Sequence, residues 1–349
     1  MPSRSAGPRS SAAPRSSGSC WLPAPSRASA TKARPDAARV RRGRSRGPLE
    51  AVFGRHDRGL AARGRRPSRI RRPRVTLRYE EYGSGPLVVL IHGSPGSARA
   101  WERVGRRLSS RFRIVAPNLP GYGGSDPRPA DIVTDTAWVA RQVEEVLTEI
   151  GRAVVLAGHS YGGNVALAVG IRGRVAIDGL ALFEPVAVPV LRAIGEEHRY
   201  LAARAVFDGY FASHERGDDK AIRTMADFWF GPGAFDAMPQ NAQEALTRAT
   251  ALNVQDVKAT FREQYSRSDL EGLTIPVLLA HGSRSPVLTS DIVDAIARHV
   301  PRSTVVTLEG ANHAMTTTHD GAVAQLIADH AARCAGPEGR PGTPAAGRP

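Results

Sequence analysis

The sequence has few cysteines and no long hydrophobic run. Its 349 residues include only Cys20 and Cys334, one near each end of the chain, which excludes a disulfide framework or a cysteine-rich zinc site. The same scarcity agrees with a reducing compartment, so we expect a cytoplasmic protein. No apolar stretch approaches the ~18 residues that a membrane-spanning helix needs, and we expect no such span.

A general excess of positive charge is also missing from most of the chain. The whole sequence has 48 Lys and Arg against 33 Asp and Glu, a net charge of +15. Residues 1–74 alone have a net charge of +17, whereas residues 75–349 have 28 basic and 30 acidic side chains, a net charge of −2. A nucleic-acid-binding globular domain is therefore disfavoured, because phosphate binding needs a basic surface. We expect no specific nucleic-acid partner.

Residues 1–74 are rich in Arg, Ser, Ala, Pro and Gly and show no sustained hydrophobic period. Such a segment cannot bury enough apolar area to offset its ordering entropy, so we predict disorder. An extension without function is the favoured interpretation. An organelle transit peptide and an electrostatic tether to RNA or anionic membrane are the alternatives. Residues 335–349, rich in Gly and Pro, predict a second disordered tail.

Residues 75–334 contain short apolar runs bounded by Gly, Pro, Asn or Ser, a pattern typical of buried strands. The runs are Val75–Tyr82, Leu87–His92, Phe112–Ala116, Ala153–Ala157, Gly179–Phe183, Ile275–Ala280 and Ser303–Leu308. Between them, Trp138–Ile150 has its apolar residues on one helical face, and Ser290 followed by Asp291 predicts the capped start of a helix that runs to His299. Strands that alternate with helices predict an α/β fold: a mostly parallel sheet covered by helices on both faces.

The segment from Leu191 to Gly272 interrupts this alternation with about 80 mostly helix-forming residues. That is too long for a loop in a compact domain. We predict a helical cap at about residues 187–272, inserted in a domain that spans residues 75–334. Its aromatic residues suggest apolar acyl or aromatic groups in the substrate, although we favour core packing over direct contact. These residues are Phe228, Trp229, Phe230 and Phe235.

Residues 154–166 predict a strand, a tight turn and a helix, with Ser160 at the turn. The turn, Gly158-His159-Ser160-Tyr161-Gly162, matches the G-x-S-x-G nucleophile elbow. Side chains at Gly158 or Gly162 would collide with the neighbouring strand and helix, and Ser160 must adopt a strained conformation. The helix N-terminus favours a negative charge that develops next to it. The alternative is a glycine-rich turn with an incidental serine.

A second motif follows the strand at residues 87–91 and reads His92-Gly93-Ser94-Pro95-Gly96. With the elbow, it resembles the α/β-hydrolase superfamily, whose oxyanion hole uses one backbone N–H from this loop and one from the residue after the nucleophile. The resemblance implies Ser94 and Tyr161 as donors and a loop-supporting role for His92; direct catalysis by His92 is the less favoured alternative. The remaining residues implied to support these loops are Gly93, Gly158 and Gly162.

The resemblance continues through residues 117–125, similar to the D-x-P-G-x-G-x-S loop of the family. Asn118 stands where Asp is common, a departure that we interpret as structural. The family also places its histidine after the last strand, which implies His313, in the sequence Glu309-Gly310-Ala311-Asn312-His313. An imidazole can take the serine proton and later pass it to the leaving group. The alternatives are His281 and His319, or a surface histidine without function at position 313.

The acid departs from the commoner family pattern. The family often has Asp after the penultimate strand, where this chain has Ser285, a residue that cannot hold a negative charge opposite an imidazolium. Glu184, at the end of the preceding strand, is our candidate, since Pro185 disfavours helical geometry there and predicts an extended Glu184. Certain haloalkane dehalogenases of the superfamily take their acid from this strand end. The alternatives are Asp291 as the acid, or a Glu184 that caps a helix or binds an arginine.

The resemblance implies a serine hydrolase that cleaves a small-molecule carboxylic ester through an acyl-enzyme. Thioester, lactone or carbon–carbon bond cleavage are alternatives, while Ser in place of Asp as the nucleophile argues against epoxide hydrolases and dehalogenases. No metal and no organic cofactor is expected. The rival hypothesis is a non-catalytic ligand-binding or receptor protein on the same fold. The sequence carries no indication of an oligomeric state.

Overall fold

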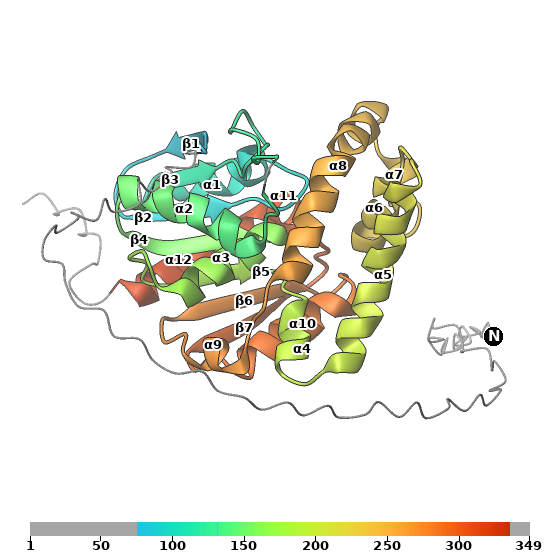
Figure 1. Ribbon diagram of the computed structural model, residues 1–349. Helices are drawn as coiled ribbons and strands as arrows, with labels where there is room; N and C mark the ends of the chain where they lie inside the picture. The colour runs from blue at the N-terminus through green and yellow to red at the C-terminus, as the bar shows by residue number, and fades with distance from the viewer. Residues whose placement is uncertain (1–74, 131, 336–349) are drawn as a thin grey trace, which may run out of the picture. The chain divides into compact units, whose positions relative to one another are not determined.

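The structure, a computed structural model, describes residues 75–130 and 132–335 (Figure 1). The expectations for residues 1–74, and for the tail after residue 335, lie outside the described residues. Seven strands form one sheet in the order β1-β3-β2-β4-β5-β6-β7. Their bounds are β1 (Tyr79–Tyr82), β2 (Leu87–Ile91), β3 (Arg113–Pro117), β4 (Ala153–His159), β5 (Leu180–Phe183), β6 (Val277–Gly282) and β7 (Ser303–Leu308).

The sheet is parallel except at β1, which pairs antiparallel with β3. Its central strands are buried on both faces. In β2, for example, Val89 and Ile91 belong to one buried apolar cluster and Val88 and Leu90 to another. This double burial explains why the strands are continuous apolar runs in the sequence. The expected α/β-hydrolase fold with a mostly parallel sheet is confirmed.

Helices cover both faces of the sheet. The first cluster includes residues of α2 (Thr136–Ile150), α3 (Tyr161–Arg172) and α10 (Val287–Ala297). The second includes residues of η1 (Ala98–Trp101), α1 (Glu102–Leu108), α11 (Met315–Thr318) and α12 (Asp320–Cys334). The carboxyl ends of β2, β4, β5 and β7 lead into the loops that carry the site described below.

The prediction that a helix begins after Ser290 is wrong. Helix α10 begins at Val287, with Pro286 as its N-cap residue. The hydroxyl of Ser290 donates to the Val287 carbonyl at 2.9 Å, so Ser290 lies inside the helix and does not cap it. Proline is tolerated at a helix start because the first N–H groups have no partner in the helix.

Six helices separate β5 from β6. They are α4 (Pro189–Ala193), α5 (Glu197–Glu215), α6 (Ile222–Phe230), α7 (Ala234–Ala237), α8 (Gln240–Arg262) and α9 (Arg267–Glu271). Figure 1 shows α5, α6, α7 and α8 gathered at one side of the sheet. Helix α8 contacts α2 and α3, which cover the sheet, and also contacts α5 and α6, so this long helix joins the inserted helices to the rest of the domain. In the part of the chain that the structure describes, no helix is both long enough and apolar enough to cross a membrane.

Candidate active site

Ser160 occupies the turn between β4 and α3. Its backbone has φ +56° and ψ −123°, a conformation that residues other than glycine rarely adopt. A Cβ at Gly158 would lie 2.2 Å from the Gly162 carbonyl oxygen, and a Cβ at Gly162 would lie 2.4 Å from the carbonyl oxygens of Ile91 and His92. The close approach of β4, α3 and β2 therefore requires glycine at both positions, and it fixes Ser160 between them.

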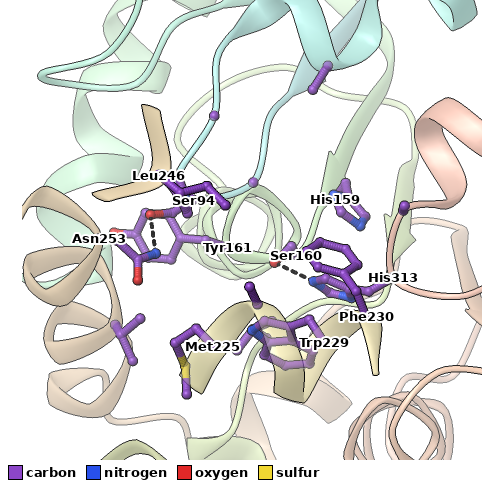
Figure 2. A pocket seen from close by; sticks show the side chains of 18 of the residues that line it. Ser94, His159, Ser160, Tyr161, Met225, Trp229, Phe230, Leu246, Asn253 and His313 are labelled. Atoms are coloured by element: carbon purple, nitrogen blue, oxygen red, sulfur yellow. Dashed lines mark hydrogen bonds between the residues drawn. The ribbon is translucent and has the colours of Figure 1, made fainter. Parts of the chain in front are cut away.

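His313 lies next to Ser160, although 153 residues separate them in the sequence. It comes from the loop between β7 and α11 and is almost fully buried. Its Nε2 atom is 2.9 Å from the Ser160 Oγ atom, and Figure 2 shows this contact as a dashed line. The distance is suitable for transfer of the serine proton to the imidazole.

Glu184 completes a chain of three side chains. One oxygen, Oε2, is 2.5 Å from His313 Nδ1, and the other, Oε1, accepts the Gly282 N–H at 2.7 Å. Burial raises the pKa of Glu184, but the hydrogen bond and charge of His313 lower it, with help from the Ser285 hydroxyl and the Gly282 N–H. The pKa therefore lies below its usual value, and Glu184 is charged at neutral pH. Ser285, at the position where the family often has its acid, thus lies beside this carboxylate.

The backbone of Glu184 is not extended, and that prediction is wrong. Its φ is +46°. The rule for a residue before proline disfavours the right-handed helical region and does not prevent a positive φ. Glu184 donates its own N–H to the Ala280 carbonyl at 2.8 Å while its carboxylate bonds Gly282 and His313. A strained residue persists only where such contacts determine its conformation, which is common at functional sites.

His92 is fully buried, and both of its ring nitrogens are engaged. Nδ1 donates to the Gly93 carbonyl at 2.7 Å, and Nε2 accepts the Leu119 N–H at 2.9 Å. Burial lowers the pKa of His92 to about 4. A neutral histidine with both nitrogens occupied joins the loop after β2 to the loop after β3. A Cβ at Gly93 would lie 3.0 Å from Ser160 Cβ, so glycine there lets this loop approach the serine.

The other candidates from the sequence have different partners. His281 contacts Thr307 at 3.1 Å, and His319 contacts the neighbouring Thr318 at 2.9 Å. Asp291 forms an ion pair with Arg199 at 3.2 Å. The structure thus places these three alternatives away from the Ser160–His313 pair.

Asn118 belongs to the loop after β3. Its Oδ1 atom accepts the Ala98 N–H at 2.8 Å, and its carbonyl accepts the Ser125 hydroxyl at 2.7 Å. The first contact needs only an acceptor oxygen on the side chain, which Asn provides, and the second uses the backbone carbonyl, which does not depend on the side chain. The contacts join the loop to η1 and agree with a structural role.

Two residues that line the cavity beside Ser160 have backbone N–H groups without an acceptor among the described residues. Among the described residues, neither the Ser94 N–H nor the Tyr161 N–H donates to another backbone group or side chain, although both residues line the cavity next to Ser160. Tyr161 is the first residue of α3, where the helix leaves its N–H groups free. Free, fixed donors at this place could stabilise a negatively charged oxygen.

A cavity of about 240 Å³ lies against Ser160. Its walls are mostly apolar and include Met225, Trp229, Phe230 and Leu246 from the inserted helices (Figure 2). The ring of Trp229 stacks on His313 with 4.2 Å between centroids. Trp229 and Phe230 thus line the cavity, and Trp229 also packs against the first apolar cluster as expected.

The other two aromatic residues of the cluster pack as expected. Phe228 contacts the rings of Phe207 and Trp229, and Phe235 is fully buried. Residues 228–230 are consecutive on α6, so helical geometry directs their side chains to different sides. The sequence alone does not show which of these aromatic residues line the cavity and which only pack in the core.

His159 also lines the cavity, and sequence reasoning did not single it out. Its ring centroid is 4.8 Å from that of His313, and burial lowers the pKa of His159 to about 3. His159, Glu184 and His313 together offer ligand atoms within 4.8 Å of one another, a set that could in principle hold a metal ion. Glu184 and His313 already bond each other, however, and His313 also bonds Ser160. This pairing suits proton transfer better than metal binding.

Comparison with known proteins agrees with this geometry. The profile of the "Alpha/beta hydrolase family" matches residues 88–326. The chain is 26% identical over 253 residues to a 2-(acetamidomethylene)succinate hydrolase of Mesorhizobium japonicum, a match that covers 69% of this chain and 86% of the relative. It is 24% identical over 252 residues to a pimeloyl-[acyl-carrier protein] methyl ester esterase of Nitrosomonas europaea, with 69% and 93% covered.

Solved structures show the same fold. A thermophilic esterase from Thermogutta terrifontis, with malate bound, has a TM-score of 0.57 and 24% identity, and the match covers 74% of this chain and 94% of the esterase. The esterase EaEST from Exiguobacterium antarcticum has a TM-score of 0.59 and 19% identity, with 74% and 96% covered. At these identities the likeness concerns the fold alone.

Proposed function

The chain belongs to the alpha/beta hydrolase family and is a hydrolase, and on that premise we propose that it cleaves a small-molecule carboxylic ester with Ser160 as nucleophile. The observation that carries the proposal is the continuous hydrogen-bonded chain from Ser160 Oγ through His313 to Glu184, buried beside a mostly apolar cavity. Two relatives named as a hydrolase and a methyl ester esterase support the reaction class.

The proposed reaction has two halves. In the first, His313 Nε2 takes the Ser160 proton while Oγ attacks the ester carbonyl, and the N–H groups of Ser94 and Tyr161 bind the oxygen that becomes negative. His313 then gives the proton to the leaving alcohol, and an acyl-enzyme remains. In the second half, water attacks the acyl group, His313 takes its proton, and the acid is released with Ser160 restored. Glu184 stays charged throughout and stabilises the protonated His313.

The cavity favours a compact substrate. Its volume of about 240 Å³ is below the roughly 300–1,000 Å³ of most ligand pockets, and Met225, Trp229 and Phe230 narrow it from α6. We propose that the helices between β5 and β6 form a cap, and that esters with short acyl chains are the preferred substrates. Short thioesters and lactones fit the same chemistry.

We also propose a cytoplasmic location for the protein, because the chain has only two cysteines.

The rival proposal of a non-catalytic ligand binder depended on a missing acid at Ser285. The contact between Glu184 and His313 at 2.5 Å brings a carboxylate from the end of β5 to His313 and so supports the enzyme. A series of p-nitrophenyl esters from acetate to decanoate tests the proposal. We expect kcat/KM to be highest for acetate or butyrate and to fall by at least tenfold for decanoate. Absence of turnover on every ester, with tight binding of one of them, would favour the binder.

A further inference from the structure

A buried carboxylate lies behind the candidate oxyanion loop, on the inserted helix α8. Asp256 is fully buried. Its Oδ2 atom accepts the Ser94 hydroxyl at 2.5 Å and the Tyr122 hydroxyl at 2.7 Å. Its Oδ1 atom pairs with the guanidinium of Arg128, whose side chain is only 4% exposed. One carboxylate thus receives two hydroxyl groups and one cation.

The charge on Asp256 has a specific use in this arrangement. Burial raises the pKa of Tyr122, so Tyr122 keeps its proton and donates it. The Ser94 hydroxyl donates its single proton to the same oxygen. A carboxylate only accepts hydrogen bonds, and an ionised acceptor binds donors more strongly than a neutral one. An ion pair in such a buried place is weak evidence for stability, because apolar residues of similar size often serve as well. Its position suggests another role.

Asn253 approaches the same serine from one turn earlier on α8. Residues three apart lie on one face of a helix, so Asn253 and Asp256 both face the loop. Asn253 Nδ2 donates to Ser94 Oγ at 2.9 Å, as Figure 2 shows, and its Oδ1 accepts the Tyr210 hydroxyl at 2.8 Å. The Ser94 side chain is therefore held by two residues of α8, with Tyr122 at 2.9 Å on a third side.

Ser94 is also the residue whose backbone N–H we assign to the oxyanion hole. Three contacts on its side chain restrict its rotation and so fix the direction of that N–H. The other assigned donor, Tyr161, is affected by the charge of the same pair: burial raises the pKa of its hydroxyl to about 12, and the charge of Arg128 opposes this rise. Both donors thus have side chains that interact with the Asp256–Arg128 pair or lie in its field.

We propose that Asp256 is a positioning residue for the oxyanion hole. From helix α8 it holds the loop of Ser94, whose N–H is one of the two assigned donors. Asp256 does not line the cavity and acts through Ser94. The inserted helices then do more than enclose the substrate, because a displacement of α8 would also misalign one oxyanion donor. The inference rests on the proposed function, since it concerns the same Ser160 reaction.

The test is Asp256→Asn, measured on p-nitrophenyl butyrate. We expect kcat to fall at least tenfold with KM changed less than twofold, because the oxyanion forms only after substrate has bound. The inhibition constant of a trifluoromethyl ketone, which forms a charged tetrahedral adduct with the serine, should rise in parallel with the loss in kcat/KM. A merely structural role would reduce the number of active molecules, counted by end-point fluorophosphonate titration, and leave both constants per active site unchanged.

A matched control is Glu144→Gln. Glu144 pairs with Arg172 at 2.6 Å between α2 and α3, is buried, and does not line the cavity. Its loss removes a second largely buried ion pair, whose two side chains form no hydrogen bond with Ser94, Asn253 or Asp256. We expect kcat and the inhibition constant per active site to stay within twofold of the wild-type values.

Two further variants keep the test decisive if Asp256→Asn does not fold. Asp256→Asn combined with Arg128→Gln removes both charges together and leaves no unpaired buried ion. Ser94→Ala keeps the backbone N–H and removes only the link to α8. Both should show the same loss in kcat and in ketone affinity. A folded variant of either kind with wild-type values would overturn the positioning role. Wild-type protein that hydrolyses no ester and takes up no fluorophosphonate would instead overturn the proposed function, and the inference with it.

Discussion

Trp229 lies flat against His313, with ring centroids 4.2 Å apart and planes inclined by 17°. The tryptophan comes from α6, and the histidine comes from the loop after β7. The inserted helices thus contact the proposed base through Trp229 and the proposed oxyanion loop through Asp256. An aromatic face next to an imidazole restricts the orientation of the imidazole ring.

Replacing Trp229 with Ala should lower kcat/KM by about three- to tenfold, which lies within the range expected from ~0.5–1.5 kcal/mol for an aromatic contact. Trp229→Phe keeps a ring above His313 and should stay within threefold of wild type. Steady-state kinetics on p-nitrophenyl butyrate separates the two. Equal activity of Trp229→Ala and wild type would show that the stack does not assist His313.

Glu184→Gln should keep the shape of the side chain and lose its charge. We expect kcat to fall by several orders of magnitude, since the acid-to-amide change in a serine protease costs ~10⁴. His313→Gln should be about as damaging as loss of the serine, because the residues of a triad act as a unit. Initial rates at pH 7.5 measure both.

Asp291→Asn is the control for Glu184→Gln. It removes the partly exposed pair with Arg199 and should leave kcat within twofold of wild type. Ser285→Asp in the Glu184→Gln background should restore part of the activity, because Ser285 lies beside Glu184. A normal rate for Glu184→Gln together with a low rate for Asp291→Asn would refute the assignment of the acid.

Stability should fall as the pH is lowered from about 6.5 to about 4. Burial lowers the pKa of His92 and of His330 to about 4, whereas the unfolded value is about 6.5. Between these values the unfolded chain binds more protons than the folded chain. For each histidine the free energy of unfolding therefore decreases by up to about 1.4 kcal/mol for every unit by which the pH is lowered. Above pH 6.5 neither contributes a slope.

His330→Gln isolates this effect at a position outside the cavity lining. Urea unfolding at pH 7.5 and pH 5 should show a smaller loss of stability on acidification for this variant than for wild type. His281→Gln, which replaces a partly exposed histidine of β6, is the control and should leave the loss unchanged. Identical losses in all three proteins would exclude the buried histidine as a source of acid sensitivity.

Gly162→Ala should destabilise the protein by at least ~1–3 kcal/mol, the usual range for an overpacked core. The added Cβ would lie 2.4 Å from two carbonyl oxygens of the β2 end, and backbone atoms cannot move as a flexible side chain does. Gly209→Ala on α5 meets nothing within 4 Å and should stabilise by ~0.5–1 kcal/mol. Urea denaturation compares them; a neutral Gly162→Ala would contradict the tight packing of the turn.

The residues of the proposed triad could be predicted because each lies in a local motif. Ser160 has its flanking glycines, and His313 and Glu184 each follow the end of an apolar strand. The conformation of Glu184 could not be predicted, because contacts with Gly282 and His313 determine its φ, and these come from distant parts of the chain.

The residues behind the oxyanion loop had no local signal. Asp256 and Asn253 read as ordinary polar residues inside a long helix, and Asp256 meets Ser94 across 162 positions of sequence. The start of α10 was misplaced for a related reason. A serine before an acidic residue resembles an N-cap, whereas in the structure Pro286 is the N-cap residue and the helix begins at Val287.

The central claim is that Ser160 is the nucleophile, and covalent labelling tests it most directly. Wild-type protein and Ser160→Ala are treated with a fluorophosphonate, and intact mass and peptide mapping locate the adduct. We predict one adduct per wild-type chain, on Ser160, and none on Ser160→Ala, which should also lose ester turnover while its melting temperature stays near the wild-type value. An adduct of equal yield on Ser160→Ala, or ester hydrolysis at the wild-type rate by that variant, would contradict the account.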